Sequence, residues 1–232
     1  MDMFTFTALE REALMLSTRV ALWCVVVSLP CGVAVGWLLA RKDFPGKAMV
    51  DGLVHLPLVL PPVVVGYALL VLFGRQGPLG EWLYGTFGLE IAFTWKGAVL
   101  ASAVMAFPLM VRAIRLSIEA VDPGLEAAAR TLGAGPLGVL FSVTLPLAWP
   151  GILTGMVLAF ARSLGEFGAT ITFVSNIPGE TRTLPLALFG LTQSPGGEMA
   201  AGRLVIISTV LAFAALMASE ILARHIRKRL AA

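Results

Sequence analysis

Five apolar segments, each long enough to cross a lipid bilayer as a helix, constrain this chain more than any other feature of its sequence. They lie at residues 14–40, 48–73, 96–118, 148–174 and 203–223. A spanning helix needs about 20 apolar residues, and in lipid a helix satisfies its own backbone hydrogen bonds. Only 13% of the residues are charged, against about 25% in soluble domains. We therefore predict an all-α integral membrane protein with five transmembrane helices.

The positive charges of the chain are concentrated in alternate connections between these segments. The connections after the first and third segments and the tail hold Arg41, Lys42 and Lys47; Arg112, Arg115 and Arg130; and Arg224, Arg227, Lys228 and Arg229. Because lysine and arginine favour cytoplasmic connections, we expect the N-terminus outside and the C-terminus in the cytoplasm. The N-terminal stretch has no basic region of a signal peptide, so the first span is expected to be retained.

This topology divides the chain into three parts. We predict an extracytoplasmic N-terminus (1–13), a transmembrane domain (14–224) with a cytoplasmic loop at 119–147, and a basic cytoplasmic tail (225–232). Five spans disfavour two inverted repeats within one chain, so the symmetry of a transport path would come from a second copy. The net charge of +3 is sorted by connection rather than gathered on one face, so no nucleic-acid partner is expected.

The cytoplasmic loop has the pattern of two short helices joined by a sharp turn. Asp122 is a good N-cap residue, and Gly133 stands where a left-handed residue would end the first helix. Pro136 then starts a second helix, which we expect to end at Pro146 before the next span.

The first of these short helices is amphipathic. Helical spacing places Leu125, Ala128, Ala129 and Leu132 on one apolar stripe. Glu126 and Arg130 form an i, i+4 pair on another face. Two interpretations stay open, because such a helix can pack on the ends of its own spans or dock into the groove of a partner protein.

A spaced pattern in this loop carries a family resemblance. Glu126-Ala127-Ala128 is followed by Gly133, seven positions after Glu126, and then by Val143-Thr144-Leu145-Pro146. This resembles the EAA loop of permeases from binding-protein-dependent ABC importers, with Val143 in place of an isoleucine. The resemblance implies the type I importer transmembrane domain and a loop that inserts into an ATPase subunit. The coupling residues that it implies are Leu125, Glu126, Ala127, Ala128, Leu132, Gly133, Leu145 and Pro146.

Three further stretches narrow this resemblance. Residues 161–189 ("ARSLGEFGATITFVSNIPGETRTLPLALF"), 55–67 and 107–122 are similar to the molybdate and tungstate permeases. The sulfate permeases resemble the chain less closely, so sulfate or another oxyanion is the alternative cargo. The resemblance implies that two copies pair around a central path in the inner membrane, with two ATP-binding subunits below and a periplasmic oxyanion-binding protein outside.

The chain shows no motif for chemistry of its own. It lacks the P-loop pattern as well as H-E-x-x-H and G-x-S-x-G, and His55 and His225 stand alone. We expect no catalytic site, no metal site and no bound cofactor, so a partner chain would have to use the ATP. An integral membrane enzyme would need a convergent set of catalytic groups. A channel or secondary carrier is opposed by the docking pattern and the absence of a repeat.

Polar groups and prolines inside the spans are the candidates for a translocation path. In the fourth segment Arg162 and Glu166 can neutralise each other as i, i+4 neighbours, either facing a path or as a structural pair. Prolines in the second segment would kink its helix, which is tolerated where the opened backbone faces protein or a water-filled path. The candidates are Arg162, Ser163, Glu166, Thr170, Pro61 and Pro62. The apolar "LPLALFGL" within 175–202 suggests a short outer helix that dips towards the path.

Overall fold

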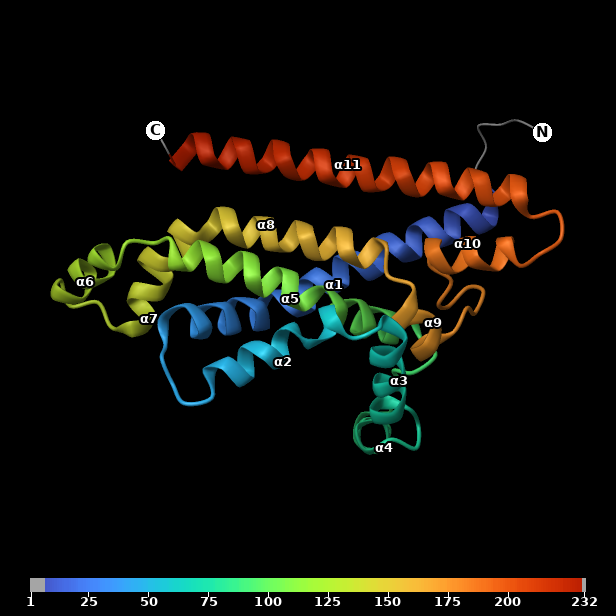
Figure 1. Cartoon of the computed structure of the whole chain (residues 1–232), viewed down its shortest axis with the longest axis horizontal. Coiled ribbons are helices and arrows are strands. Elements are labelled where there is room, and N and C mark those ends of the chain that lie inside the picture. Colours follow the sequence, from blue (N-terminus) through green and yellow to red (C-terminus); the bar gives the residue numbers. More distant parts are fainter. Residues whose placement is uncertain (1–6, 231–232) are drawn as a thin grey trace.

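The computed structural model describes residues 7–230, and their side chains over residues 7–217; the expected basic tail at 225–232 lies outside the described side chains. The described chain is helical throughout its length (Figure 1). Its helices are α1 (Ala8–Arg41), α2 (Lys47–Val59), α3 (Pro62–Phe73), α4 (Pro78–Phe87), α5 (Trp95–Glu119), α6 (Pro123–Thr131), α7 (Pro136–Val139), a π-helical turn (Leu140–Thr144), α8 (Leu145–Leu164), α9 (Gly168–Val174), α10 (Leu184–Thr192) and α11 (Glu198–Leu230).

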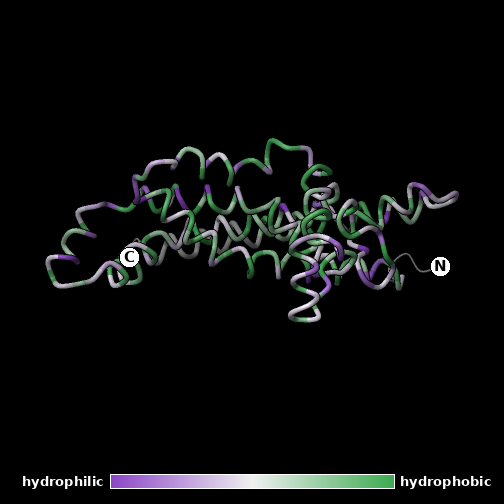
Figure 2. The backbone as a smooth tube through the Cα atoms, turned by 90° about the horizontal axis from the view of Figure 1, so that it is seen from below, coloured by the Kyte–Doolittle hydropathy of each residue, from purple (hydrophilic) through white to green (hydrophobic). Residues whose placement is uncertain are grey.

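Four stretches of helix are long and apolar enough to cross a membrane, and a fifth if the bent pair α2–α3 is one span. They are α1, α5, the run from α7 through α8, and α11 over its first 20 residues. In Figure 1 these helices run side by side along the long axis, and the tube in Figure 2 is mostly white to green along them. The prediction of an all-α protein with about five membrane-spanning helices is confirmed.

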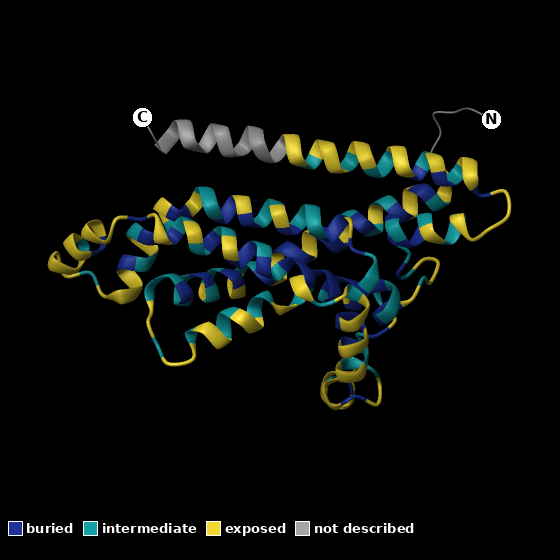
Figure 3. Ribbon diagram, in the orientation of Figure 1, coloured by how far each residue is buried: buried dark blue, intermediate teal, exposed yellow. Residues whose placement is uncertain are grey.

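The centre of the bundle is built on small residues. Gly32 and Gly36 of α1 lie against Met110 and Ile114 of α5, where an added Cβ would fall 2.8 and 2.9 Å from their side chains. Gly155 brings α8 within similar reach of the Met110 carbonyl. Small residues let helix backbones approach closely, which is the main source of packing energy in lipid. In Figure 3 the buried residues are concentrated where these three helices meet.

The second span is broken rather than kinked. The chain changes direction by 112° between α2 and α3. The backbone is extended at Leu60 and also non-helical at Pro61, the two residues between these helices. Neither Pro61 nor Pro62 can donate an amide hydrogen bond, and the residue before a proline is disfavoured in helical conformation. Two successive prolines therefore stop one helix and start another, so the continuous helix expected over 48–73 was wrong.

The fourth span differs from its expected range, 148–174, at both ends. It begins earlier, because α8 continues the helix that starts at α7, and it stops at Leu164. Residues 165–167 are not helical, and α9 follows as a separate short helix. Together with the break at residues 60–61 this makes a second interrupted helix, and we call the two the paired breaks.

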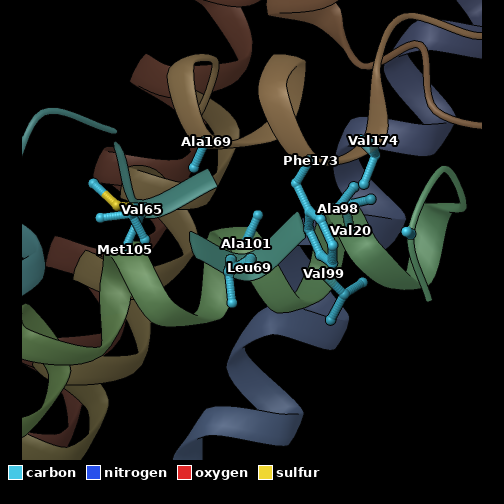
Figure 4. Packing of buried hydrophobic residues seen from close by; sticks show 11 residues of the cluster. Val20, Val65, Leu69, Ala98, Val99, Ala101, Met105, Ala169, Phe173 and Val174 are labelled. Carbon is cyan, nitrogen blue, oxygen red and sulfur yellow. The ribbon is translucent and has the colours of Figure 1, made fainter. Parts of the chain in front are cut away.

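The paired breaks pack against each other through glycine. A Cβ on Gly168 of α9 would lie 2.7 Å from the Cβ of Pro62, and one on Gly66 of α3 would lie 2.5 Å from the carbonyl oxygen of Ala169. Figure 4 shows Val65 and Leu69 of α3 in one cluster with Ala169 and Phe173 of α9 and with Ala101 of α5. This contact buries α9 in the apolar cluster of α3 and α5.

Replacing Gly66 with valine should destabilise the folded chain by more than the roughly 1–3 kcal/mol of an overpacked core, because the new Cβ meets backbone that cannot rotate away. A thermal melt of the detergent-purified chain measures this. Gly52→Val is the matched control, since an added Cβ on Gly52 in α2 has no neighbour within 4 Å. Equal melting temperatures for both variants would contradict the close contact.

The predicted helix within 175–202 exists as α10, but it does not face open space. Leu184 and Ala187 of α10 pack with Ala13 of α1 and Leu204 of α11 in one buried cluster. Helix α10 therefore fixes the N-terminal end of α1 against α11, and its Phe189 ring lies 5.0 Å from that of Phe167 in the second of the paired breaks; its dip towards a path stays a prediction.

Candidate functional site

The first candidate site is the elbow, which we define as residues 122–144 (α6, α7 and the π-helical turn). It projects from one end of the bundle (Figure 1). The Asp122 side chain accepts a hydrogen bond from the Gly124 amide at 2.8 Å, which caps α6. Gly133 has a φ of +90°, and the Ala134 amide reaches back to the Ala129 carbonyl. This is the left-handed C-terminal motif that the sequence predicts.

The second helix of the elbow does not end at Pro146 as expected. A π-helical turn over Leu140–Thr144, closed by the Leu145 amide on the Leu140 carbonyl, joins α7 directly to α8. Proline is tolerated near such a turn because the widened backbone has no use for the missing amide. Helix α7 and the π-helical turn therefore extend the α8 span without interruption, and α6 is connected to them through residues 132–135.

The elbow exposes apolar side chains and buries a charged one. The side chains of Leu132 and Leu137 are 89% and 70% exposed, and those of Leu125 and Phe141 are also exposed. Glu126, in contrast, is a buried residue. The stripe of α6 therefore does not pack on the ends of its own spans, and Figure 3 shows α6 mostly exposed. Of the two interpretations left open by the sequence, this arrangement favours docking onto a partner.

Glu126 connects α6 both to the π-helical turn of the elbow and to α1. Its Oε1 accepts hydrogen bonds from Thr144 Oγ1 at 2.8 Å and from Arg41 Nε at 3.1 Å. The same Arg41 donates to the Val121 carbonyl at 2.9 Å. The predicted partner Arg130 does approach Glu126, but at 3.5 Å and with a side chain that is 59% exposed. The stronger partners, Arg41 and Thr144, were missed because neither is near Glu126 in sequence.

The second candidate site is the pair of charges at the end of α8. Arg162 Nη1 lies 2.8 Å from Glu166 Oε2, and the Glu166 side chain is 1% exposed. Glu166 lies beyond the end of α8, in the second of the paired breaks, and its Oε1 accepts from the Ala169 amide at 2.8 Å. The ion pair is confirmed, but the expectation that both charges lie on one continuous helix was wrong. Glu166 instead caps α9.

The other predicted path residues have different surroundings. Thr170 donates its hydroxyl to the Phe167 carbonyl at 2.8 Å, as a hydroxyl satisfied by its own helix does. Ser163 turns its side chain to Cys24 of α1, while its backbone carbonyl accepts from the Glu166 amide at 3.1 Å. Pro62 packs on Gly168, and Pro61 is exposed at the start of α3. The structure thus brings Pro62, Arg162 and Glu166 to the paired breaks and leaves Ser163 and Thr170 in helix packing.

No group of three or more histidine, cysteine, aspartate and glutamate side chains that could hold a metal ion occurs among the described residues. His55 contacts Asp51 on its own helix, while His225 lies outside the described side chains. The two cysteines, Cys24 and Cys31, are both free.

Comparison with known proteins identifies the family. The model of the family described as "Binding-protein-dependent transport system inner membrane component" matches residues 32–232. The molybdenum transport system permease protein ModB of Escherichia coli strain K12 is 64% identical over 220 residues, covering 95% of this chain and 96% of that protein. A probable sulfate transport system permease protein of Chlorokybus atmophyticus is 35% identical, covering 79% of this chain and 66% of that protein.

Solved structures agree on the fold. One chain of a bacterial ABC transporter involved in the import of the polysaccharide alginate superposes with a TM-score of 0.75 at 16% identity, covering 95% of this chain and 81% of that one. At this identity the likeness shows the fold alone. The family match spans most of the length, including the elbow, both interrupted helices and α11. This chain is a multi-pass membrane protein that belongs to the family of binding-protein-dependent transport system inner membrane components.

Proposed function

We propose that this chain is the membrane-spanning permease subunit of an ATP-driven importer that moves molybdate, with tungstate as a second cargo, across the inner membrane. The observation that carries the proposal is the 64% identity, over 95% of the chain, to a molybdenum transport permease. The elbow supports it, because an exposed apolar tip held by a buried ion pair fits docking onto another protein.

The proposed assembly contains two copies of this chain, two ATP-binding subunits and a periplasmic oxyanion-binding protein. The chain itself would bind no cofactor and hold no catalytic site, and the partner ATPase would use the ATP. Energy is required because a dianion that enters against a negative-inside potential costs about 4.6 kcal/mol per 100 mV, each charge contributing about 2.3. A passive channel would let the anion leave.

The elbow would be the surface that meets the ATPase, through Leu125, Glu126, Ala127, Ala128, Leu132 and Gly133, with Leu145 and Pro146 at its junction with α8. The translocation path would run past the paired breaks. Arg162 supports this, since its side chain is 27% exposed beside the buried Glu166 and offers a partly neutralised cation to an anion. Pro61 and Pro62 would keep the backbone open there, and Ser163 and Thr170 would act through helix packing.

Uptake of labelled molybdate tests the proposal, in cells that lack this chain alone and in the same cells with it restored. Restored uptake that excess tungstate blocks and excess sulfate does not is the expected result. Equal competition by sulfate would widen the cargo to oxyanions in general, in line with the more distant sulfate relative. Uptake that is unchanged by the chain would overturn the cargo assignment.

Replacing Leu132 with glutamate should lower ATP-driven uptake at least tenfold without unfolding the chain. This side chain is 89% exposed, so its loss removes little packing within the chain, whereas a charge at the centre of a docking surface is costly to bury. Co-purification of the ATPase with the variant measures the effect. Thr131→Glu adds the same charge at a neighbouring polar and exposed position, and should retain most of the ATPase. If both variants bound the ATPase like the parent, Leu132 would not be a docking residue.

A further inference from the structure

Helix α1 runs the whole length of the bundle without interruption. It has 34 residues, which is about 51 Å at 1.5 Å per residue. Two other spans are interrupted by the paired breaks, and one of them, α8, is also joined to the elbow through a π-helical turn. Pro30 lies inside α1, but α10 packs on the helix before this proline and α5 packs on Gly32 and Gly36 after it, so α1 has the form of a single rod.

The N-terminal end of this rod is held by polar contacts to the connections and helices at that end of the bundle. Glu10, a buried residue that also caps α1, lies 3.0 Å from Arg203 of α11. Glu12 accepts from the Gly179 amide. Ser17 accepts from the amide of Leu184, the first residue of α10, at 2.7 Å.

At the C-terminal end of the rod, Arg41 makes the polar contacts that connect α1 to the elbow. Its guanidinium donates through Nη2 to the Val121 carbonyl and through Nε to Glu126. The pair is well shielded, with side-chain exposures of 16% for Arg41 and 7% for Glu126. Since Glu126 also accepts from Thr144, this arginine joins the last turn of α1 to both arms of the elbow.

A shielded arginine that donates to both a carboxylate and a backbone carbonyl is held more rigidly than a surface ion pair. We propose that Arg41 is a positioning residue that makes α1 move with the elbow as one body, so that a displacement of the elbow reaches the opposite end of the bundle through α1. The inference rests on the proposed function for its biological meaning. Under that function, the ATPase would move the elbow, and the rod would carry the movement to the end where α10 and the 175–183 connection lie.

The functional experiment uses the complete transporter, reconstituted with its ATPase and binding protein. Arg41→Ala leaves Glu126 bonded to Thr144 and near Arg130, and unlike Glu126→Lys it adds no like charge. It should therefore keep the elbow folded and retain the ATPase and its basal ATP hydrolysis, while the stimulation of hydrolysis by loaded binding protein falls about tenfold and uptake falls with it.

Lys42→Ala is the matched control, because this neighbouring cation is exposed and its charge lies over the ring of Trp37 on α1, not against Glu126. A purely structural role would instead lower assembly and basal hydrolysis together. Full stimulation in Arg41→Ala would overturn the proposal.

A second measurement needs no cargo, and therefore separates this inference from the proposed transport of molybdate. Spin labels are attached to Lys42→Cys at the end of α1 and to Thr131→Cys at the end of α6, both exposed sites, and labelled chain is diluted with unlabelled chain. The distance between the labels should stay the same when ATP binds to the complex. The added variant Arg41→Ala should broaden that distance or change it. A distance that changes with ATP while Arg41 is present would show that α1 and the elbow move independently, whatever the cargo is.

Discussion

Replacing Glu126 with lysine is expected to abolish transport, because it places a second cation against Arg41 at a buried position. The native carboxylate accepts from Arg41 at 3.1 Å and from Thr144 at 2.8 Å. Breaking a buried ion pair from one side costs about 3–5 kcal/mol, and here the loss falls on the contacts that hold α6 to α1 and to the π-helical turn. We expect a chain that still inserts in the membrane but carries a detached elbow.

Three measurements on the Glu126→Lys variant follow from this: uptake, co-purification of the ATPase, and cleavage of the elbow by protease, which should rise at least tenfold. The matched control is Arg130→Ala, which removes the partner at 3.5 Å whose side chain is 59% exposed. Exposed pairs of this kind contribute about 0–1 kcal/mol, so the control should transport normally. If both variants behaved alike, Glu126 would be acting as a surface charge, and the buried network would have no role in coupling.

The second large effect is expected at Glu166. Replacing it with alanine leaves Arg162 without its partner and removes the acceptor of the Ala169 amide at the start of α9. The remaining Arg162 is 27% exposed, so the loss of its partner should cost less than the roughly 3–5 kcal/mol of a fully buried pair, and the unsatisfied Ala169 amide adds about 1–3 kcal/mol. We expect the paired breaks to separate, with loss of both stability and uptake.

Two further variants separate the effect of the Glu166 charge from that of its hydrogen bond. Glu166→Gln keeps an oxygen for the Ala169 amide and loses only the charge, so its melting temperature should lie between those of the parent and the alanine variant. Thr154→Ala is the control on the same helix, because that hydroxyl is exposed and bonds only to the Pro150 carbonyl. If Glu166→Ala had the same melting temperature as Thr154→Ala, the Arg162–Glu166 ion pair would not stabilise the paired breaks.

Features set by neighbouring residues could be predicted from the sequence. The spans follow from runs of apolar residues, and the ends of α6 follow from Asp122 and Gly133, whose side chain or backbone acts within a few positions. The prolines at 61 and 62 predicted a disturbance of the helix, but its angle of 112° depends on α9 packing against α3.

Features set by tertiary contact could not be predicted. Arg41 had the sequence signature of a topology charge, and its contact with Glu126, 85 positions away, appears only when α1 and the elbow are packed together. Ser163 looked like a path residue because its helix is apolar, yet the rotation of α8 turns it towards Cys24. The end of α8 could not be predicted, because the apolar residues that follow in α9 are compatible with one continuous helix as well as with two separate helices.

The π-helical turn makes the orientation of the elbow depend on chain length. Relative to a regular α-helix, this turn accommodates an extra residue between α7 and α8, and each residue of an α-helix turns the chain by about 100°. One more residue inserted within Leu140–Thr144, beyond the one that the turn absorbs, would rotate Leu137 and α6 by about 100° about the axis of α8. Point substitutions at the exposed Phe141 or Ser142 leave the rotation of α7 about the axis of α8 unchanged. Evolution of this segment should therefore accept changes of residue type far more readily than insertions or deletions.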